Sequence, residues 1–88
     1  MSKGHDMLLD AARAVAERGK VYGDAASNME TTASLWSVVL GVDVTPSQVA
    51  MCMLQVKVAR LLVTPDHSDS VVDIAGYAAV LRETQADV

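Results

Sequence analysis

Four stretches of this chain carry apolar residues at helical spacing, and glycine or proline stands at the breaks between them. The stretches cover about residues 6–18, 24 or 27 to 40, 45–62, and 68 or 70 to 83. No segment alternates over a useful length with the two-residue period of a strand. We therefore predict an all-α fold, a four-helix bundle-like protomer that forms a single domain over residues 1–88.

The third stretch has the clearest helix start. Thr45 can cap the helix, Pro46 suits its first position, and Gln48 completes a capping box. The first stretch has weaker limits, with Asp6 as the expected cap and Gly19 as the expected end.

Composition indicates that one protomer cannot hide all of its apolar surface. The chain has 88 residues, of which 51% are hydrophobic, and a chain this short buries only about 60–65% of its unfolded surface. The fourth stretch is apolar most of the way round, so both of its sides need a cover. We expect the second cover to be another copy, so that homo-oligomerisation completes the bundle.

Charge and cysteine content exclude several classes of protein. Seven Lys and Arg stand against eleven Asp and Glu, and the resulting net charge of −4 makes nucleic-acid binding unfavourable. Cys52 is the one cysteine, which excludes an intrachain disulfide and a cysteine zinc site. The longest apolar run, Val49–Val63, contains Lys57 and Arg60 and is too short to span a bilayer. We expect a cytoplasmic protein with no membrane partner.

Lys57 and Arg60 are the first candidates for binding. They lie three positions apart and therefore share a face of an otherwise apolar helix. They could extend from the rim of the core into solvent, or hold a phosphate group with Arg60 bidentate. Spacing alone leaves both roles open.

The start of the fourth stretch carries the second group of candidates. Asp69 and Asp73 lie four apart on one helical face and could hold Mg²⁺ together with waters and substrate phosphates. The structural alternative is a Ser70–Asp73 capping box. His67 could be a general acid or base, or a loop histidine bonded to backbone. Tyr77 could stack on a base or fill the core.

Several motifs together form a recognisable pattern. They are Arg18–Asp24, Asn28, Leu35–Ser37, Lys57–Leu61 and Asp66–Ala78, the most specific part being Asp69–Tyr77. This pattern, from about Ala11 to Glu83, resembles a small phage-encoded family often described as MazG-like. MazG-like proteins are all-α nucleoside triphosphate pyrophosphohydrolases that bind Mg²⁺ through acidic motifs on two helices and usually form dimers or tetramers.

The resemblance implies a nucleotide site with a role for each candidate. Phosphate would be held by Lys57 and Arg60, the base would stack on Tyr22 or Tyr77, Mg²⁺ would bind Asp69 and Asp73, and proton transfer would involve His67. The chain departs from the family at Glu30, which has no acidic partner three residues away.

These observations lead to one expected function and two alternatives. We expect a MazG-like nucleotide-binding protein, located in the host cytoplasm if phage-encoded, and leave open whether it is a Mg²⁺-dependent triphosphate pyrophosphohydrolase. The missing acidic motif on the second stretch favours the first alternative, a non-enzymatic binder such as a sponge for a signalling nucleotide. The second alternative is a module that binds a host protein through an apolar helical face. The expected partners are a second copy and a nucleotide.

Overall fold

A computed structural model describes residues 2–85, apart from the side chain of Tyr22. These residues form four α-helices and no strand: α1 (Lys3–Tyr22), α2 (Ala25–Leu40), α3 (Pro46–Val63) and α4 (Ser68–Thr84). The prediction of an all-α chain with four helices is confirmed. None of the helices in this range has both the length and the apolar character needed to cross a membrane.

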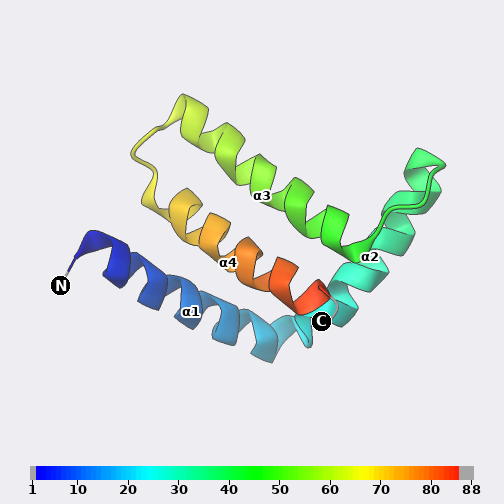
Figure 1. The fold of residues 1–88 in the computed structure, drawn as a ribbon, viewed down its shortest axis with the longest axis horizontal. Helices are drawn as coiled ribbons and strands as arrows, with labels where there is room; N and C mark the ends of the chain where they lie inside the picture. Colours follow the sequence, from blue (N-terminus) through cyan, green and yellow to red (C-terminus); the bar gives the residue numbers. More distant parts are fainter. Residues whose placement is uncertain (1, 86–88) are drawn as a thin grey trace.

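Three of the helices lie side by side in one layer. α4 is in the middle, with α1 on one side and α3 on the other, and α2 crosses the end of the layer and projects beyond it (Figure 1). Both sides of α4 are thus covered within the same chain. The cover of these two sides comes from α1 and α3, while Val71, Ala78 and Ala79 of α4 stay exposed, so the expected cover by a second copy stays a prediction.

The first helix extends beyond both predicted limits. It begins after Ser2, whose Oγ accepts a hydrogen bond from the backbone N–H of His5. It ends at Gly23, which has a φ of 78° and donates its N–H to the carbonyl of Gly19. The predicted limits Asp6 and Gly19 therefore both lie inside the helix. Of the two glycines, only Gly23 takes the positive φ that ends a helix.

The third helix begins as predicted. The N–H of Gln48 donates to Thr45 Oγ1 over 3.1 Å, and the N–H of Thr45 donates to Gln48 Oε1 over 2.9 Å. The loop before this helix is tied to α2, since Ser37 Oγ accepts from the N–H of Val44. Together these bonds fix the direction in which α3 leaves the end of α2.

The core of the described chain consists of few and small side chains. Its buried apolar residues are Ala11, Ala33, Val49 and Ala50. Many larger apolar side chains are exposed, most of all at the far ends of α2 and α3. The single chain therefore leaves much apolar surface in contact with water.

Candidate functional site

A cleft of about 830 Å³ lies between the four helices. Its polar side chains are Arg18, Asp24, Asn28, Thr32, Asp73, Tyr77 and Glu83. Its apolar side chains include Val15, Val49, Met53, Val72 and Val80. We call it the interhelical cleft. Its size and its mixture of apolar walls with a few polar groups are typical of sites for small ligands.

Two charged side chains of the cleft lining, Arg18 of α1 and Asp73 of α4, form a cluster with Lys57 of α3, which does not itself line the cleft. Lys57 Nζ of α3 lies 3.2 Å from Asp73 Oδ2, and Arg18 Nη2 of α1 lies 3.8 Å from Asp73 Oδ1. Lys57 and Asp73 are 14% and 23% exposed, whereas Arg18 is 56% exposed. The Arg18–Asp73–Lys57 cluster thus holds one more positive than negative charge, and its most accessible member is a guanidinium.

The two predicted cations of α3 do not share a site. Lys57 turns toward Asp73, whereas Arg60 lines a shallow groove with His67, the residue that caps the start of α4. Residues three positions apart lie on the same side of a helix, but their side chains do not point in the same direction. Lys57 and Arg60 can therefore contact different neighbours.

The two predicted metal ligands are separated as well. Asp73 lines the cleft, while Asp69 is exposed in the first turn of α4 and is not part of the lining. Residues 2–85 contain no group of three or more Asp, Glu, His or Cys that could hold a metal ion. As arranged, Asp69 and Asp73 do not fit a Mg²⁺ site, because an ion bound to Asp73 has to displace Lys57 and Arg18.

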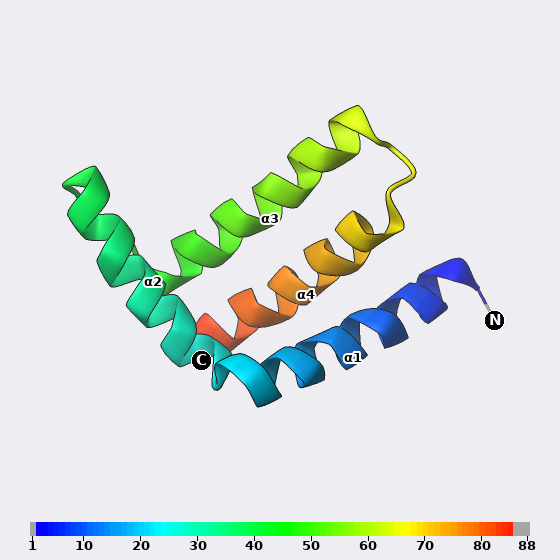
Figure 2. The ribbon, with the colours of Figure 1, turned by 180° about the vertical axis from the view of Figure 1, so that it is seen from behind.

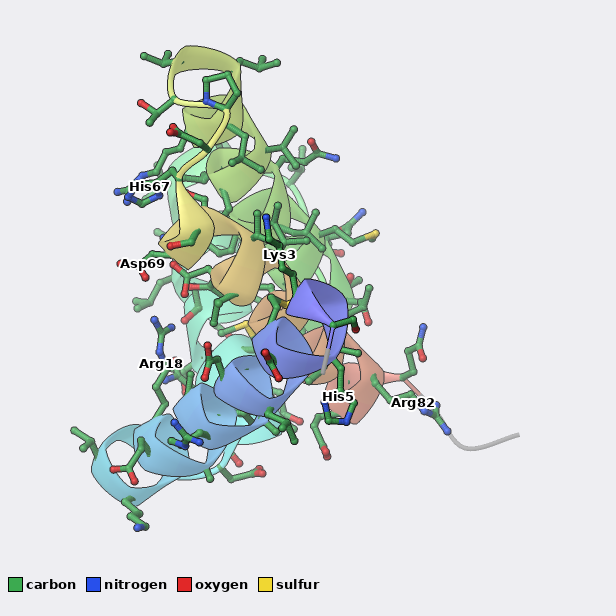
Figure 3. All side chains as sticks on the ribbon, turned by 90° about the vertical axis from the view of Figure 1, so that its left-hand side faces the viewer. Lys3, His5, Arg18, His67, Asp69 and Arg82 are labelled. Carbon is green, nitrogen blue, oxygen red and sulfur yellow. The ribbon has the colours of Figure 1, made fainter. Side chains whose placement is uncertain are left out.

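His67 is the cap of α4. Its Nδ1 accepts from the backbone N–H of Ser70 over 3.2 Å and lies 2.7 Å from Ser70 Oγ. The predicted Ser70–Asp73 capping box is therefore wrong: Ser70 is buried against His67, and the carboxylate of Asp73 faces Lys57. Because Nδ1 accepts a hydrogen bond, the neutral imidazole carries its proton on Nε2. His67, Asp69 and Arg18 lie along one side of the molecule (Figure 3).

The two tyrosines differ in what the structure describes. Tyr77 is half-buried on α4 and lines the interhelical cleft. Tyr22 is the last residue of α1, and its side chain lies outside the described part of the chain. Of the aromatic residues proposed for a base, Tyr77 is thus the one with a defined place at the cleft.

Comparison with known proteins identifies the family. The family described as "Domain of unknown function (DUF6378)" matches residues 6–85.

The chain belongs to the DUF6378 family. Among curated proteins, this DUF6378 chain is 47% identical over 70 residues to the Gene 55 protein of Mycobacterium phage L5, covering 78% of the chain and 45% of that protein. It is 38% identical over 77 residues to the Gene 55 protein of Mycobacterium phage D29, covering 86% and 51%. The chain spans about half the length of these relatives. No solved structure matches it. The expected kinship with phage proteins is confirmed, and the names of these relatives state no activity.

Three cleft residues of the DUF6378 chain were not singled out from the sequence. Arg18, Asp24 and Asn28 line the cleft although no binding role was assigned to them. The signal was present, since all three lie in the stretches that carried the family resemblance. Nothing in their spacing, however, indicates that the α1–α2 turn faces Asp73.

Asp24 is also the cap of α2. Ser27 donates both its hydroxyl, over 2.9 Å, and its backbone N–H, over 3.1 Å, to Asp24 Oδ2. These two bonds, the hydroxyl first, hold the pKa of the Asp24 carboxyl below its usual value. Asp24 is therefore a fixed anion at the α1–α2 side of the cleft.

Proposed function

We propose that this DUF6378 chain is a MazG-like protein that binds a nucleotide in the interhelical cleft. The observation that carries the proposal is the Arg18–Asp73–Lys57 cluster, of which Arg18 and Asp73 line a cleft of about 830 Å³ and Lys57 pairs with Asp73 from outside the lining. A nucleotide needs a cationic contact for its phosphate next to an apolar space for its base, and the cleft offers both.

Arg18 is the group best suited to receive the phosphate. Its guanidinium lies 3.8 Å from Asp73, which is too far for a hydrogen bond, and its side chain is mostly exposed. Its donors are therefore available, and a guanidinium can bind phosphate through two parallel hydrogen bonds. In this role Asp73 orients the two cations, and Lys57 offsets its charge.

The cleft also offers side chains that suit a base. Tyr77 can stack on a heteroaromatic ring, and the Asn28 amide offers both donors and an acceptor for polar ring edges. The anionic Asp24 beside them favours a base edge that carries donors. The cleft therefore supports recognition of adenine, guanine or cytosine, whose edges carry an amino donor, over uracil or thymine, which have no amino group.

Binding without hydrolysis is the version that the arrangement supports best. Phosphoanhydride hydrolysis with Mg²⁺ needs carboxylates to hold the metal and to polarise water. In this chain Asp73 is engaged by two cations, and Asp69 does not line the cleft. For a phage-encoded member of the family, such a binder would act on nucleotides in the host cytoplasm.

The test is calorimetric titration of the chain with nucleoside mono-, di- and triphosphates and cyclic nucleotides, in Mg²⁺ and in EDTA. Arg18→Gln should weaken binding at least tenfold, which corresponds to about 1.4 kcal/mol. The matched control is Arg13→Gln, since Arg13 is on the same helix, forms an exposed pair with Asp10, and does not line the cleft. The bound nucleotide should be recovered intact.

Two results would count against this assignment. If no nucleotide binds, or if the Arg18→Gln and Arg13→Gln variants bind it with equal affinity, the cleft is not a nucleotide-binding site. Pyrophosphate release that requires Mg²⁺, stops in EDTA and is lost in Asp73→Asn would instead establish the pyrophosphohydrolase.

A further inference from the structure

The far end of α2 is an apolar surface with no cover. Its side chains, between 61% and 82% exposed, are those of Leu35, Val38, Val39, Leu40 and Val42. We call this surface the α2 tip. It projects past the other three helices (Figure 1), and no charged residue occurs from Thr31 to Val42. Soluble monomers rarely keep such a contiguous apolar patch in water.

A second uncovered apolar surface follows the outer face of α3. Cys52, Val56, Ala59 and Val63 are exposed and spaced four, three and four positions apart, so they share one helical face. The C-terminal half of this face borders the groove of about 470 Å³ that also contacts Arg60 and His67. We call it the α3 groove.

The α2 tip cannot cover the α3 groove of its own chain. α2 and α3 approach each other where α3 begins, and their far ends diverge, as both views of the ribbon show (Figures 1 and 2). The α2 tip and the α3 groove of one chain therefore lie apart and cannot contact each other. In a dimer with a two-fold axis, the tip of each copy can cover the groove of the other.

We propose that this chain forms a homodimer in which the α2 tip of each copy occupies the α3 groove of the other. This inference rests on the exposed surfaces alone and is independent of nucleotide binding. The sequence led us to expect self-association through α4. The interface proposed here is instead formed by α2 and α3.

The area offered is sufficient for a stable dimer. Each exposed Leu or Val can bury on the order of 60–120 Å². The tip and the groove face together therefore supply roughly 500–900 Å² per copy, close to the ~800 Å² per partner of a standard interface. The small core of the single chain agrees with a fold that gains part of its burial from a partner.

The charges at the two surfaces are complementary. Asp43 directly follows the tip, and Arg60 borders the groove. Within residues 2–85 Arg60 has no ion pair, so it is available to an acid of a second copy. A reciprocal fit brings opposite charges to the same rim, which the net charge of −4 would otherwise oppose.

The first test is the mass of the full chain by light scattering coupled to gel filtration. The wild type should have twice the 9.3 kDa of one chain, and Val38→Glu/Val39→Glu should have the mass of one chain. The control is Val21→Glu, which places one such charge at another exposed valine, on α1 and away from both surfaces. It should remain a dimer. Far-ultraviolet circular dichroism should show unchanged helix content in all variants.

A second test identifies the contact itself. In a Cys52→Ser background, chains carrying Val39→Cys are mixed with chains carrying Ala59→Cys and oxidised. The mixed disulfide should form in preference to either homodisulfide, and Val21→Cys mixed with Ala59→Cys should give none. The inference is overturned by a wild type with the mass of one chain, by a dimer that survives Val38→Glu/Val39→Glu, or by equal cross-linking of Val21→Cys and Val39→Cys.

Discussion

Lys57 is the least exposed of the paired lysines and arginines, and it lies 3.2 Å from Asp73. Lys57→Met keeps the length and helix propensity of the residue but leaves the half-buried Asp73 with Arg18 alone, 3.8 Å away. Because a partly desolvated carboxylate then loses its closest partner, we expect unfolding to become easier by about 1–3 kcal/mol. Urea denaturation followed by circular dichroism measures the change.

The control for this prediction is Lys20→Met. Lys20 lies 3.6 Å from Glu17 in an exposed pair on α1, and such pairs contribute little. We expect a change within about 0.5 kcal/mol for Lys20→Met. Equal changes in the free energy of unfolding for Lys57→Met and Lys20→Met would mean that the Lys57–Asp73 pair stabilises the fold no more than an exposed ion pair does.

At the scale of helices, His67 fixes the start of α4. His67→Ala removes the acceptor for the N–H of Ser70 and leaves the buried Ser70 hydroxyl without its 2.7 Å partner. We expect His67→Ala to lower the free energy of unfolding by about 1–3 kcal/mol. His67→Asn should lower it by less than half as much, because Asn is a good helix cap. His5→Ala, at an exposed histidine of α1, should change the denaturation midpoint little. A midpoint unaffected by His67→Ala would contradict the cap.

The cap of α2 gives the chain a defined response to acid. Hydrogen bonds from Ser27 lower the pKa of Asp24 below 3.8 in the folded chain. The stabilisation is thus fully present above 3.8 and is lost as pH falls through the lowered pKa, where the folded carboxyl takes up its proton. The free energy of unfolding of the wild type should exceed that of Asp24→Asn near neutral pH, and the difference should shrink as pH falls below 3.8. Thermal midpoints of both proteins across this range measure it, and a constant difference would contradict the assignment.

Helix ends show what local sequence can and cannot predict. The start of α3 followed from Thr45 and Gln48 because a capping box is complete within four residues. The C-terminal limit of α1 was missed because two glycines compete for its end, and Gly23, not Gly19, takes the positive φ.

The candidate site depended even more on tertiary packing. Lys57, Asp73 and Tyr77 were found as candidates from residue type and spacing. The pairing of Lys57 with Asp73, and the arrival of Arg18 from α1, depend on α4 lying between two other helices. Spacing along one helix carries no information about which neighbour each face will meet.

At the scale of the whole molecule, stability should depend on protein concentration. The described chain buries few apolar side chains of its own and exposes the α2 tip and the α3 groove. If two copies cover these surfaces, folding and association are linked, and the thermal midpoint rises with concentration. A tenfold increase in protein concentration stabilises the folded dimer by about 1.4 kcal/mol, which is enough to raise the thermal midpoint by a few degrees.

The Val38→Glu/Val39→Glu variant separates this linkage from other causes of stability. It should melt at a lower temperature than the wild type, and its midpoint should be the same at every concentration, because its folded chain has no partner to bind. Scanning calorimetry of both proteins over a hundredfold range of concentration makes the comparison. A wild-type midpoint that does not move would mean that the small core of one chain is sufficient, and that the apolar end of α2 tolerates water without a second copy.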